Sequence, residues 1–288
     1  ATLARVRSPS STVSTADAVT ELTGKGTPPQ GGSFPLIYRK GVSPTASTAS
    51  VAMTTEPPAA TFTNSLGMKF INVPGTEVQF CIHETRRQDY AAYSNAVPGV
   101  DTQWQNPVFE GVPLAVGEDH PVSLISWEEA KAFCDWLSTK ERRKYRLPTD
   151  REWSVATGLG DIEPPDRDTA SVNSLNTKHV YPWGTAWPPP AGVGNFADTA
   201  HAKAYPQKRI LNGYSDGFAT TAPVMSFKPN AVGLYDMAGN VQELCNDLAG
   251  WGKTNRLRRG GSFKDWSANW LASSDRAEIE ATTRYELT

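Results

Sequence analysis

The side chains with the most reactive chemistry in this sequence are three cysteines and four histidines. Cys81, Cys134 and Cys245 include no pair at CxxC spacing, so they predict neither a zinc knuckle nor a thioredoxin-like motif. Their odd number leaves two possibilities, three buried free thiols or one thiol left over from a disulfide. The histidines show no HxxxHxE or HExxH spacing and are expected at the surface or the core edge rather than on a metal; they are His83, His120, His179 and His201.

Other signatures of catalysis and of charged partners are missing from the sequence. It contains no GxSxG motif and no glycine-rich phosphate loop. The 288 residues carry a formal net charge of −2, which gives no electrostatic reason to expect nucleic acid or an anionic membrane as a partner. No apolar run approaches the roughly 18 residues that a membrane span needs. The sequence starts at Ala1 rather than Met, which leaves open whether a leader such as a signal peptide was removed.

The front of the globular region has recognisable local elements that could position a site. Alternating apolar residues over Val78–His83 predict a strand, and residues 85–95 predict a helix with Thr85 as its N-cap. The clearest helix is expected over residues 126–140, where Ser126 and Glu129 form a capping box. A second capped helix is expected from Thr149 through residue 156.

The two remaining regions are irregular in different ways. Residues 1–63 are about two thirds Ala, Ser, Thr, Gly and Pro, so this arm is expected to be extended unless it packs on a domain or on a neighbouring chain. After Gly158 the sequence consists mostly of loops rich in Trp and Gly. The nine Trp, 23 Gly and 22 Pro of the whole sequence fit an aromatic, loop-rich protein, and we expect an α+β domain over residues 64–288.

A series of short blocks in the globular region appears in one fixed order. The blocks are Asn64-Ser65-Leu66-Gly67-Met68, Arg146-Leu147-Pro148-Thr149, Tyr181-Pro182-Trp183-Gly184, Gly194-Asn195-Phe196, Asp216-Gly217-Phe218, Gly233-Leu234-Tyr235-Asp236-Met237, Gly239-Asn240-Val241-Gln242-Glu243 and Arg259-Gly260-Gly261-Ser262-Phe263. In these blocks residues 64–288 resemble the formylglycine-generating enzyme (sulfatase-modifying factor) family. The resemblance implies a loop-rich variant of the C-type lectin fold.

The resemblance also implies two structural calcium sites, which suits loops rich in Asn and Asp. Calcium takes six to eight oxygen ligands from carboxylates, amides and carbonyls. The first set would comprise the Asn195 side chain, the Phe196 carbonyl, the Asp216 side chain and the Phe218 carbonyl. The second set would comprise Asp236, Glu243 and the carbonyls of Gly239 and Val241. The alternative is that these Asn and Asp residues only cap turns, without metal.

The enzymes of the family that this sequence resembles oxidise a substrate cysteine, and they use two copper-binding cysteines just after the Gly-Gly-Ser block. In this sequence Asp265 and Trp270 stand where the motif would place them, and no cysteine follows Cys245. Because two thiolates select a soft ion such as Cu(I), no copper is expected here. The departure favours a non-catalytic protein on a calcium-stabilised scaffold.

The family that this sequence resembles closes its fold with a last strand of the type Gly-Phe-Arg-Cys. The resemblance implies that this strand would begin about one residue after Thr288 and is missing here. The family's partner for Cys134 lies in that strand, so this thiol would lack it. An open strand position leaves unpaired backbone groups, and residues 1–63 are one candidate to fill it, in the same chain or in a neighbour. The other candidate explanation is a truncated sequence.

Three functions remain as hypotheses. The first is a secreted or cell-surface binding or assembly protein that self-associates or binds a protein ligand; some members that it resembles are diversified by retroelements. Its ligand face would comprise Lys264, Asp265, Trp266, Asn269, Trp270 and Arg276, with Trp and Arg typical of binding hot spots. The alternative is that Trp266 and Trp270 belong to the core, and this alternative is favoured for Trp270. The second is an oxygen-dependent oxidase with an atypical site. The third, a carbohydrate binder, depends on the lectin analogy alone, because no EPN or QPD motif is present.

Overall fold

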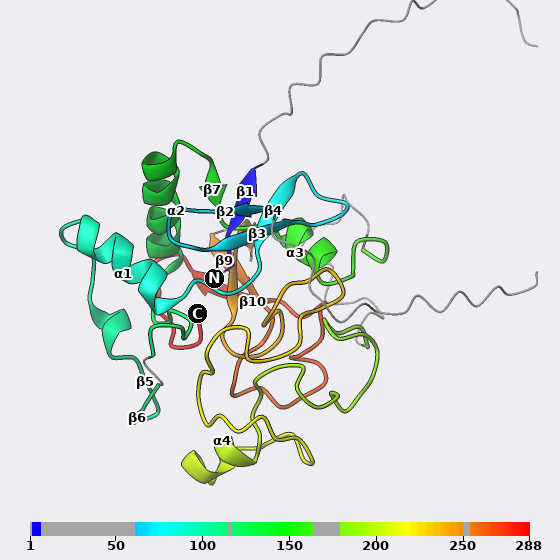
Figure 1. Ribbon diagram of the computed structural model, residues 1–288. Coiled ribbons are helices and arrows are strands. Elements are labelled where there is room, and N and C mark those ends of the chain that lie inside the picture. Colours follow the sequence, from blue (N-terminus) through cyan, green and yellow to red (C-terminus); the bar gives the residue numbers. More distant parts are fainter. Residues whose placement is uncertain (1, 7–60, 115–116, 164–178, 250–253) are drawn as a thin grey trace, which may run out of the picture. The chain divides into compact units, whose positions relative to one another are not determined.

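The largest sheet of the protein has five strands in the order β2-β3-β4-β1-β7 (Figure 1). The computed structural model describes residues 2–6, 61–114, 117–163, 179–249 and 254–288. The five strands are β1 (Ala4–Val6), β2 (Phe62–Thr63), β3 (Lys69–Asn72), β4 (Val78–Cys81) and β7 (Tyr145–Arg146). All four neighbouring pairs are antiparallel.

Strand β1 brings the start of the sequence into the interior of this sheet. Ala4 lies opposite Phe80 of β4 on one side and opposite Arg146 of β7 on the other. Phe62–Thr63 forms the edge strand β2. The segment expected to form an extended arm over residues 1–63 therefore contributes strands to the sheet at both of its ends. Residues 7–60 of that arm lie outside the described residues.

Both faces of the five-stranded sheet are covered by apolar clusters. Successive side chains of a strand point to opposite faces, so neighbouring residues belong to different clusters. Phe70 of β3 and Cys81 of β4 belong to one apolar cluster, together with residues of the two longest helices. Their neighbours Ile71 and Phe80 belong to a second cluster, which contains Trp153 and Leu257. Burial on both faces fixes the register of β3 and β4, since a shift by one residue would exchange the two sets.

The helices confirm most of the local predictions. Helix α2 (Trp127–Glu141) begins at the predicted capping box, where the Ser126 hydroxyl accepts a hydrogen bond from Glu129 N at 3.2 Å and the Glu129 carboxylate accepts one from Ser126 N at 2.8 Å. Helix α3 (Asp150–Ala156) is capped by Thr149, as predicted. Strand β4 confirms the predicted strand over its first four residues.

Helix α1 (Arg87–Ala96) starts later than predicted. Its N-cap is Arg86 rather than Thr85, and the Asp89 carboxylate accepts a hydrogen bond from Arg86 N at 3.0 Å. The reason is a tertiary pairing, because the Thr85 carbonyl accepts a hydrogen bond from Val122 N at 2.9 Å. That pairing engages Thr85 with a distant segment and leaves it one residue before the N-cap, which a sequence pattern does not record.

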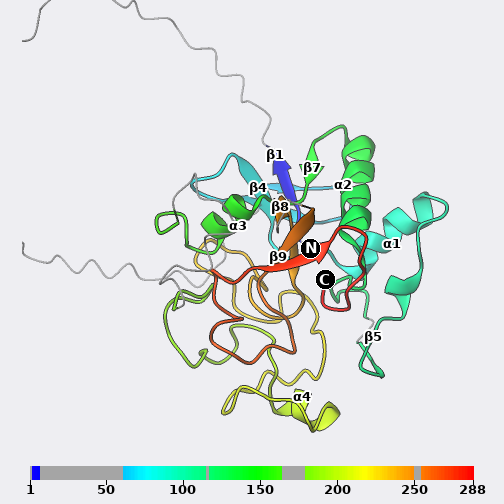
Figure 2. The ribbon, with the colours of Figure 1, turned by 180° about the vertical axis from the view of Figure 1, so that it is seen from behind.

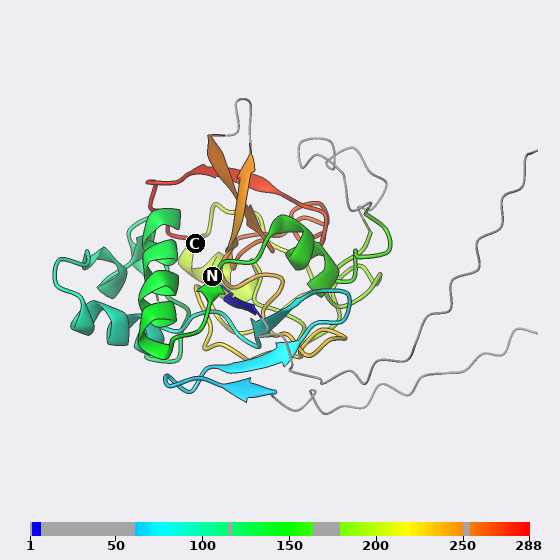
Figure 3. The same ribbon diagram turned by 90° about the horizontal axis from the view of Figure 1, so that it is seen from above.

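A second, three-stranded sheet in the order β10-β9-β8 is antiparallel and carries residues close to the site (Figure 3). Its strands are β8 (Glu243–Ala249), β9 (Asn255–Arg259) and β10 (Ala277–Glu280). A short ribbon pairs β5 (Val108–Phe109) with β6 (Val112–Pro113), and a 3₁₀ turn covers Gln103–Gln105. In residues 179–242 the only regular element is α4 (Thr199–Ala204), which lies at the far end of the loops in Figure 2.

The short helices and small antiparallel sheets confirm the expected loop-rich α+β class. Among the described helices, none combines the length and the hydropathy that crossing a bilayer requires.

Candidate functional site

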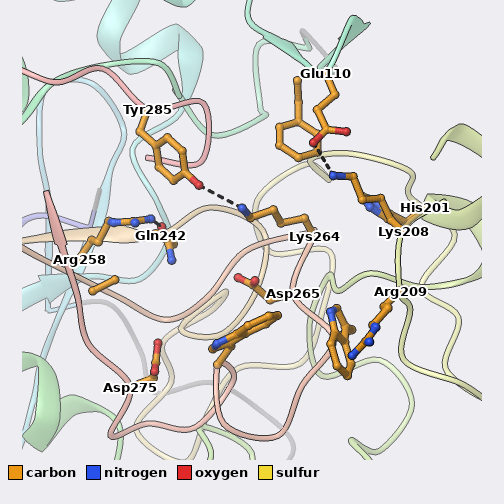
Figure 4. A pocket seen from close by; sticks show the side chains of 14 residues that line it. Glu110, His201, Lys208, Arg209, Gln242, Arg258, Lys264, Asp265, Asp275 and Tyr285 are labelled. Atoms are coloured by element: carbon orange, nitrogen blue, oxygen red, sulfur yellow. Dashed lines mark hydrogen bonds and ion pairs between the residues drawn. The ribbon is translucent and has the colours of Figure 1, made fainter. Parts of the chain in front are cut away.

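A cavity of about 370 Å³ lies where the loop after β9 meets the β5–β6 ribbon and the loop after α4 (Figure 4). Segments from five parts of the sequence line it. The lining residues are Phe109, Glu110, His201, Lys208, Arg209, Gln242, Arg258, Lys264, Asp265, Trp266, Trp270, Asp275, Ala277 and Tyr285. We call this cavity the basic–aromatic pocket.

Two basic side chains on one side of the pocket are held by an aromatic ring. Lys264 Nζ donates a hydrogen bond to the Tyr285 hydroxyl at 3.0 Å. The Arg258 guanidinium lies 4.5 Å from the centre of the Tyr285 ring and donates a hydrogen bond to the Gln242 side chain. Both cations therefore have neutral partners, which position them without cancelling their charge.

Two further basic side chains approach from the loop after α4. Lys208 forms an ion pair with Glu110 at 2.5 Å, and both side chains are exposed. Arg209 lies with its guanidinium 5.3 Å from the centre of the Trp266 ring. Arg209 is thus a third pocket cation whose contact is aromatic rather than acidic.

The pocket carboxyls Asp265 and Asp275 are weaker acids than usual. Asp265 is buried and accepts hydrogen bonds from the backbone N–H and the hydroxyl of Ser262 at 2.8 and 2.9 Å. Burial raises its pKa. Burial, with repulsion from Asp265, raises the pKa of Asp275 to about 6. Burial also lowers the pKa of His201, which favours its neutral form.

Four of the six residues predicted for the ligand face line the pocket: Lys264, Asp265, Trp266 and Trp270. The indoles of Trp266 and Trp270 pack edge to face with centroids 5.5 Å apart, and Trp270 is 46% exposed rather than part of the core. Asn269 is exposed but does not line the cavity.

Arg276 does not lie on the ligand face and instead belongs to a buried charge network. It makes bidentate contacts with Asp150, including Nη2–Oδ2 at 2.9 Å, and with Glu163 at 2.8 and 3.1 Å. Arg259, also buried, forms an ion pair with the same Asp150. Burial opposes ionisation of Asp150, yet the two guanidinium groups hold its pKa below the usual value. Arg276 is therefore placed to stabilise the fold and not to bind a ligand.

Sequence reasoning missed the pocket residues that come from outside the loop after β9. They come from four distant segments that share no motif: Phe109, Lys208 with Arg209, Arg258, and Tyr285. Only the fold brings them together, so no local signal could have identified them.

The first predicted calcium set joins the buried residues Asn195 and Phe196 to the partly exposed residues Asp216 and Phe218, and it includes an oxygen without a partner. Asn195 donates hydrogen bonds from Nδ2 to Thr220 O at 2.8 Å and to Asn240 Oδ1 at 3.2 Å, but its buried Oδ1 has no hydrogen-bond partner among the described residues. The Asp216 carboxylate accepts hydrogen bonds from the N–H groups of Phe196 and Phe218 at 2.8 and 2.9 Å. Burial raises its pKa to about 7.

The second set also contains a buried oxygen without a partner. Asp236 Oδ2 accepts a hydrogen bond from Met225 N at 2.8 Å, whereas its buried Oδ1 has no partner among the described residues. Glu243 accepts hydrogen bonds from Thr2 and from the Trp153 indole. A third buried carboxylate, Glu84, accepts hydrogen bonds from Asn240 Nδ2 at 2.7 Å and Val241 N at 3.1 Å. Burial and mutual repulsion raise the pKa of Glu84.

Among the described residues, the carboxylates of Asp216, Asp236, Glu243 and Glu84 form no ion pair. The described part of the chain also contains no group of three or more His, Cys, Asp or Glu side chains already arranged to hold a metal. Each predicted set nevertheless has one buried oxygen that a cation would satisfy.

The three cysteines lie outside the pocket. All are free and buried, and burial raises the pKa of Cys81 and Cys134 to about 12 and that of Cys245 well above its usual value. None of them is a lining residue. Such thiols are poor nucleophiles and poor metal ligands, because both roles need the thiolate.

Comparison with known proteins gives a family match over most of the sequence. Residues 31–286 match the model of the sulfatase-modifying factor enzyme 1-like domain. A formylglycine-generating enzyme of Thermomonospora curvata is 32% identical over 182 residues, covering 63% of this chain and 45% of that protein. A mouse protein named inactive C-alpha-formylglycine-generating enzyme 2 is 32% identical over 174 residues, covering 59% of this chain and 47% of that protein. The matched regions thus span less than half the length of either relative.

Solved structures give weaker likenesses. PvdO from Pseudomonas aeruginosa has a TM-score of 0.49 at 22% identity, covering 73% of this chain and 78% of that chain. Treponema denticola variable protein 1 has a TM-score of 0.44 at 23% identity, covering 71% of this chain and 79% of that chain.

Proposed function

The chain belongs to the family of sulfatase-modifying factor enzyme 1-like domains, and on that premise we propose that it binds a ligand in the basic–aromatic pocket without oxidising it. The observation that carries this proposal is the chemistry of the loop after β9. Asp265 and Trp270, which stand where the resemblance would place the copper-binding cysteines, both line the pocket. A carboxylate and an indole do not supply the two thiolates that Cu(I) selects.

The local role of Asp265 supports a structural function for this residue. Its carboxylate accepts two hydrogen bonds from Ser262, and its backbone carbonyl accepts one from Ala197 N at 3.1 Å. Asp265 therefore fixes the start of the loop that carries Trp266 and Trp270. A pocket with fixed aromatic walls and several basic side chains is suited to binding.

We further propose that calcium stabilises the loops on which the pocket depends. In one site the side chains of Asn195 and Asp216 would hold the ion, and in the other those of Asp236 and Glu243. The unpartnered Oδ1 atoms of Asn195 and Asp236 fit this assignment, because an oxygen buried without a partner destabilises a fold unless a cation or water satisfies it. The ion would supply positive charge and loop order, and it would take no part in a reaction.

A secreted or cell-surface location, and self-association or a protein ligand, belong to the same proposal. The loop after β9 presents an exposed Trp270 beside basic side chains, and such a surface suits recognition of a partner. Sedimentation of the full chain over a hundredfold concentration range tests self-association. A single monomer boundary throughout would refute it.

The similarity to proteins named formylglycine-generating enzymes supports the alternative function, an oxygen-dependent oxidase with an atypical site. One experiment separates the two. The purified chain is loaded with Cu(I) under reducing conditions and incubated with a cysteine-containing peptide and oxygen, with the Thermomonospora enzyme in parallel. Mass spectrometry of the peptide should show the aldehyde only with the relative. Formation of the aldehyde by this chain would refute the non-catalytic assignment.

A further inference from the structure

We propose that the ligand of the basic–aromatic pocket is a carboxylate attached to a flat apolar group. This inference rests on the proposed function, that the pocket is a ligand-binding site. It adds the chemical class of the ligand, which neither the family nor the relatives assign.

The charge of the pocket carries the first step. Four of its lining residues are permanently basic and three are acidic, although the whole chain has a net charge of −2. Lys208 and Glu110 neutralise each other. The remaining cations, Arg209, Arg258 and Lys264, have no ion pair with a carboxylate among the described residues. The carboxyls of Asp265 and Asp275 also line the pocket and interact with Arg258 but form no ion pair with it, so four positive and three negative side chains leave the fully ionised pocket with one net positive charge for a ligand.

The way these cations are held carries the second step. Lys264 and Arg258 contact Tyr285, and Arg209 contacts Trp266. Aromatic faces and a phenol hydroxyl orient a cation while leaving its charge available. Figure 4 shows Arg258 and Arg209 on opposite sides of the pocket, with Lys264 between them and pointing toward Tyr285. A carboxylate entering the pocket would meet donors that are already oriented, and charge-assisted hydrogen bonds are among the stronger polar contacts.

The walls and the volume carry the third step. Trp266 and Trp270 form an edge-to-face pair, and Trp270 remains 46% exposed, so an aromatic face is available to a bound apolar group. The cavity of about 370 Å³ is near the small end of the range of roughly 300–1,000 Å³ that ligand pockets occupy. It fits a small aromatic acid or the terminal residue of a peptide. These are two sources of the same chemistry.

Binding of matched probes tests the proposal. N-acetylphenylalanine carries the carboxylate and a phenyl ring, and N-acetylphenylalaninamide is its neutral counterpart. Titration of the full chain, followed by tryptophan fluorescence and by calorimetry, should show saturable binding of the acid and at least about tenfold weaker binding of the amide, the effect of losing one charge-assisted hydrogen bond. Acetate, which lacks the ring, should also bind more weakly than the acid.

Variants then assign the binding to the pocket. Lys264→Gln and Arg258→Gln should each weaken binding of the acid by about tenfold, while Lys69→Gln, an equal change of charge on β3, should leave it unchanged. Arg209→Gln is a further pocket variant, and because the Arg209 side chain is exposed, this substitution is expected to leave the fold intact. Comparison of phenylacetate with an Ala-Ala-Phe peptide distinguishes a free acid from a peptide terminus. Tighter binding of either one identifies the source.

Equal binding of acid and amide, no saturable binding of any acid, or an equal effect of Lys69→Gln would each overturn the proposal. These outcomes differ from failure of the proposed function. That failure would appear as copper-dependent oxidation of the cysteine peptide, whatever the pocket's preference among these acids.

Discussion

Removing the charge of Asp150 should destabilise the fold strongly. Asp150→Asn keeps the volume of the side chain but leaves Arg259, which is fully buried, without its carboxylate partner. Arg276 would retain Glu163 alone. Breaking one partner out of a buried ion pair costs about 3–5 kcal/mol of unfolding free energy. For a domain of this size that corresponds to a fall of roughly 6–20 °C in the midpoint of thermal unfolding.

The assay is urea and thermal unfolding of the full chain, followed by circular dichroism. Asp135→Asn is the matched control, because Asp135 forms an exposed pair with Lys131 at 2.5 Å, and such pairs contribute about 0.3–0.5 kcal/mol. A loss below about 1 kcal/mol for Asp150→Asn would refute the buried-network argument. It would also reopen Arg276 as a ligand-binding residue.

The sign of the pH dependence follows from the same network. The pKa of Asp150 is held below its ordinary value of 3.8, despite burial, by Arg259 and Arg276. A carboxyl with a lowered folded-state pKa contributes stability above its unfolded-state pKa and loses it as the pH falls through the folded-state value. The difference in unfolding free energy between the unchanged chain and Asp150→Asn should therefore shrink as the pH falls below about 4.

Three other predictions concern calcium, the pocket acids and the thiols. Calcium should raise the unfolding midpoint and a chelator should lower it. Asp236→Asn should be at least as stable as the unchanged chain in chelator, because burial raises the pKa of Asp236 to about 7 and makes its charge unfavourable without a cation. This variant should lose the part of the calcium gain that comes from its own site and keep the part from the site of Asn195 and Asp216, so an undiminished calcium gain would contradict the site. The affinity for N-acetylphenylalanine, measured by calorimetric titration, should be higher at pH 5.5 than at pH 7.5. When the pH is lowered over this range, Asp275, with a pKa of about 6, loses its negative charge, and the buried His201 can only gain a positive one. A lower affinity at pH 5.5 would contradict the charge argument. A thiol reagent should label none of Cys81, Cys134 and Cys245 in the folded chain and all three after unfolding. Burial shields these thiols from the reagent and suppresses the reactive thiolate form. Rapid labelling of the folded chain would contradict their burial.

The sequence predicted elements whose cause is local. Helices α2 and α3 begin directly after their N-caps, Ser126 and Thr149, because each capping residue and its Glu partner lie three positions apart, so these starts follow from the sequence alone. Thr85 failed as a cap because Val122, far along the chain, pairs with its carbonyl. A capping residue that pairs with a distant segment cannot be recognised from its neighbours.

The site shows the same limit. Trp266 and Trp270 were assigned to the ligand face because one loop carries them after a recognisable glycine-rich block, but the sequence favoured a core position for Trp270, which is 46% exposed. Arg276 was misplaced, since its composition suits a binding surface and only Asp150 and Glu163 show that it is buried. The pairing of Lys264 with Tyr285 depends on the path of the last loop, and the interior position of β1 depends on two distant strands.

The central claim is that the loop after β9 forms a binding wall and does not hold a redox copper site. Titration of the reduced chain with Cu(I) against a competing chelator, with the oxidation of a cysteine peptide measured in the same samples, tests it most directly. The account predicts no stoichiometric copper and no aldehyde, both in the unchanged chain and in Asp265→Asn. One equivalent of tightly bound copper with turnover of the peptide, reduced in Asp265→Asn, would contradict it.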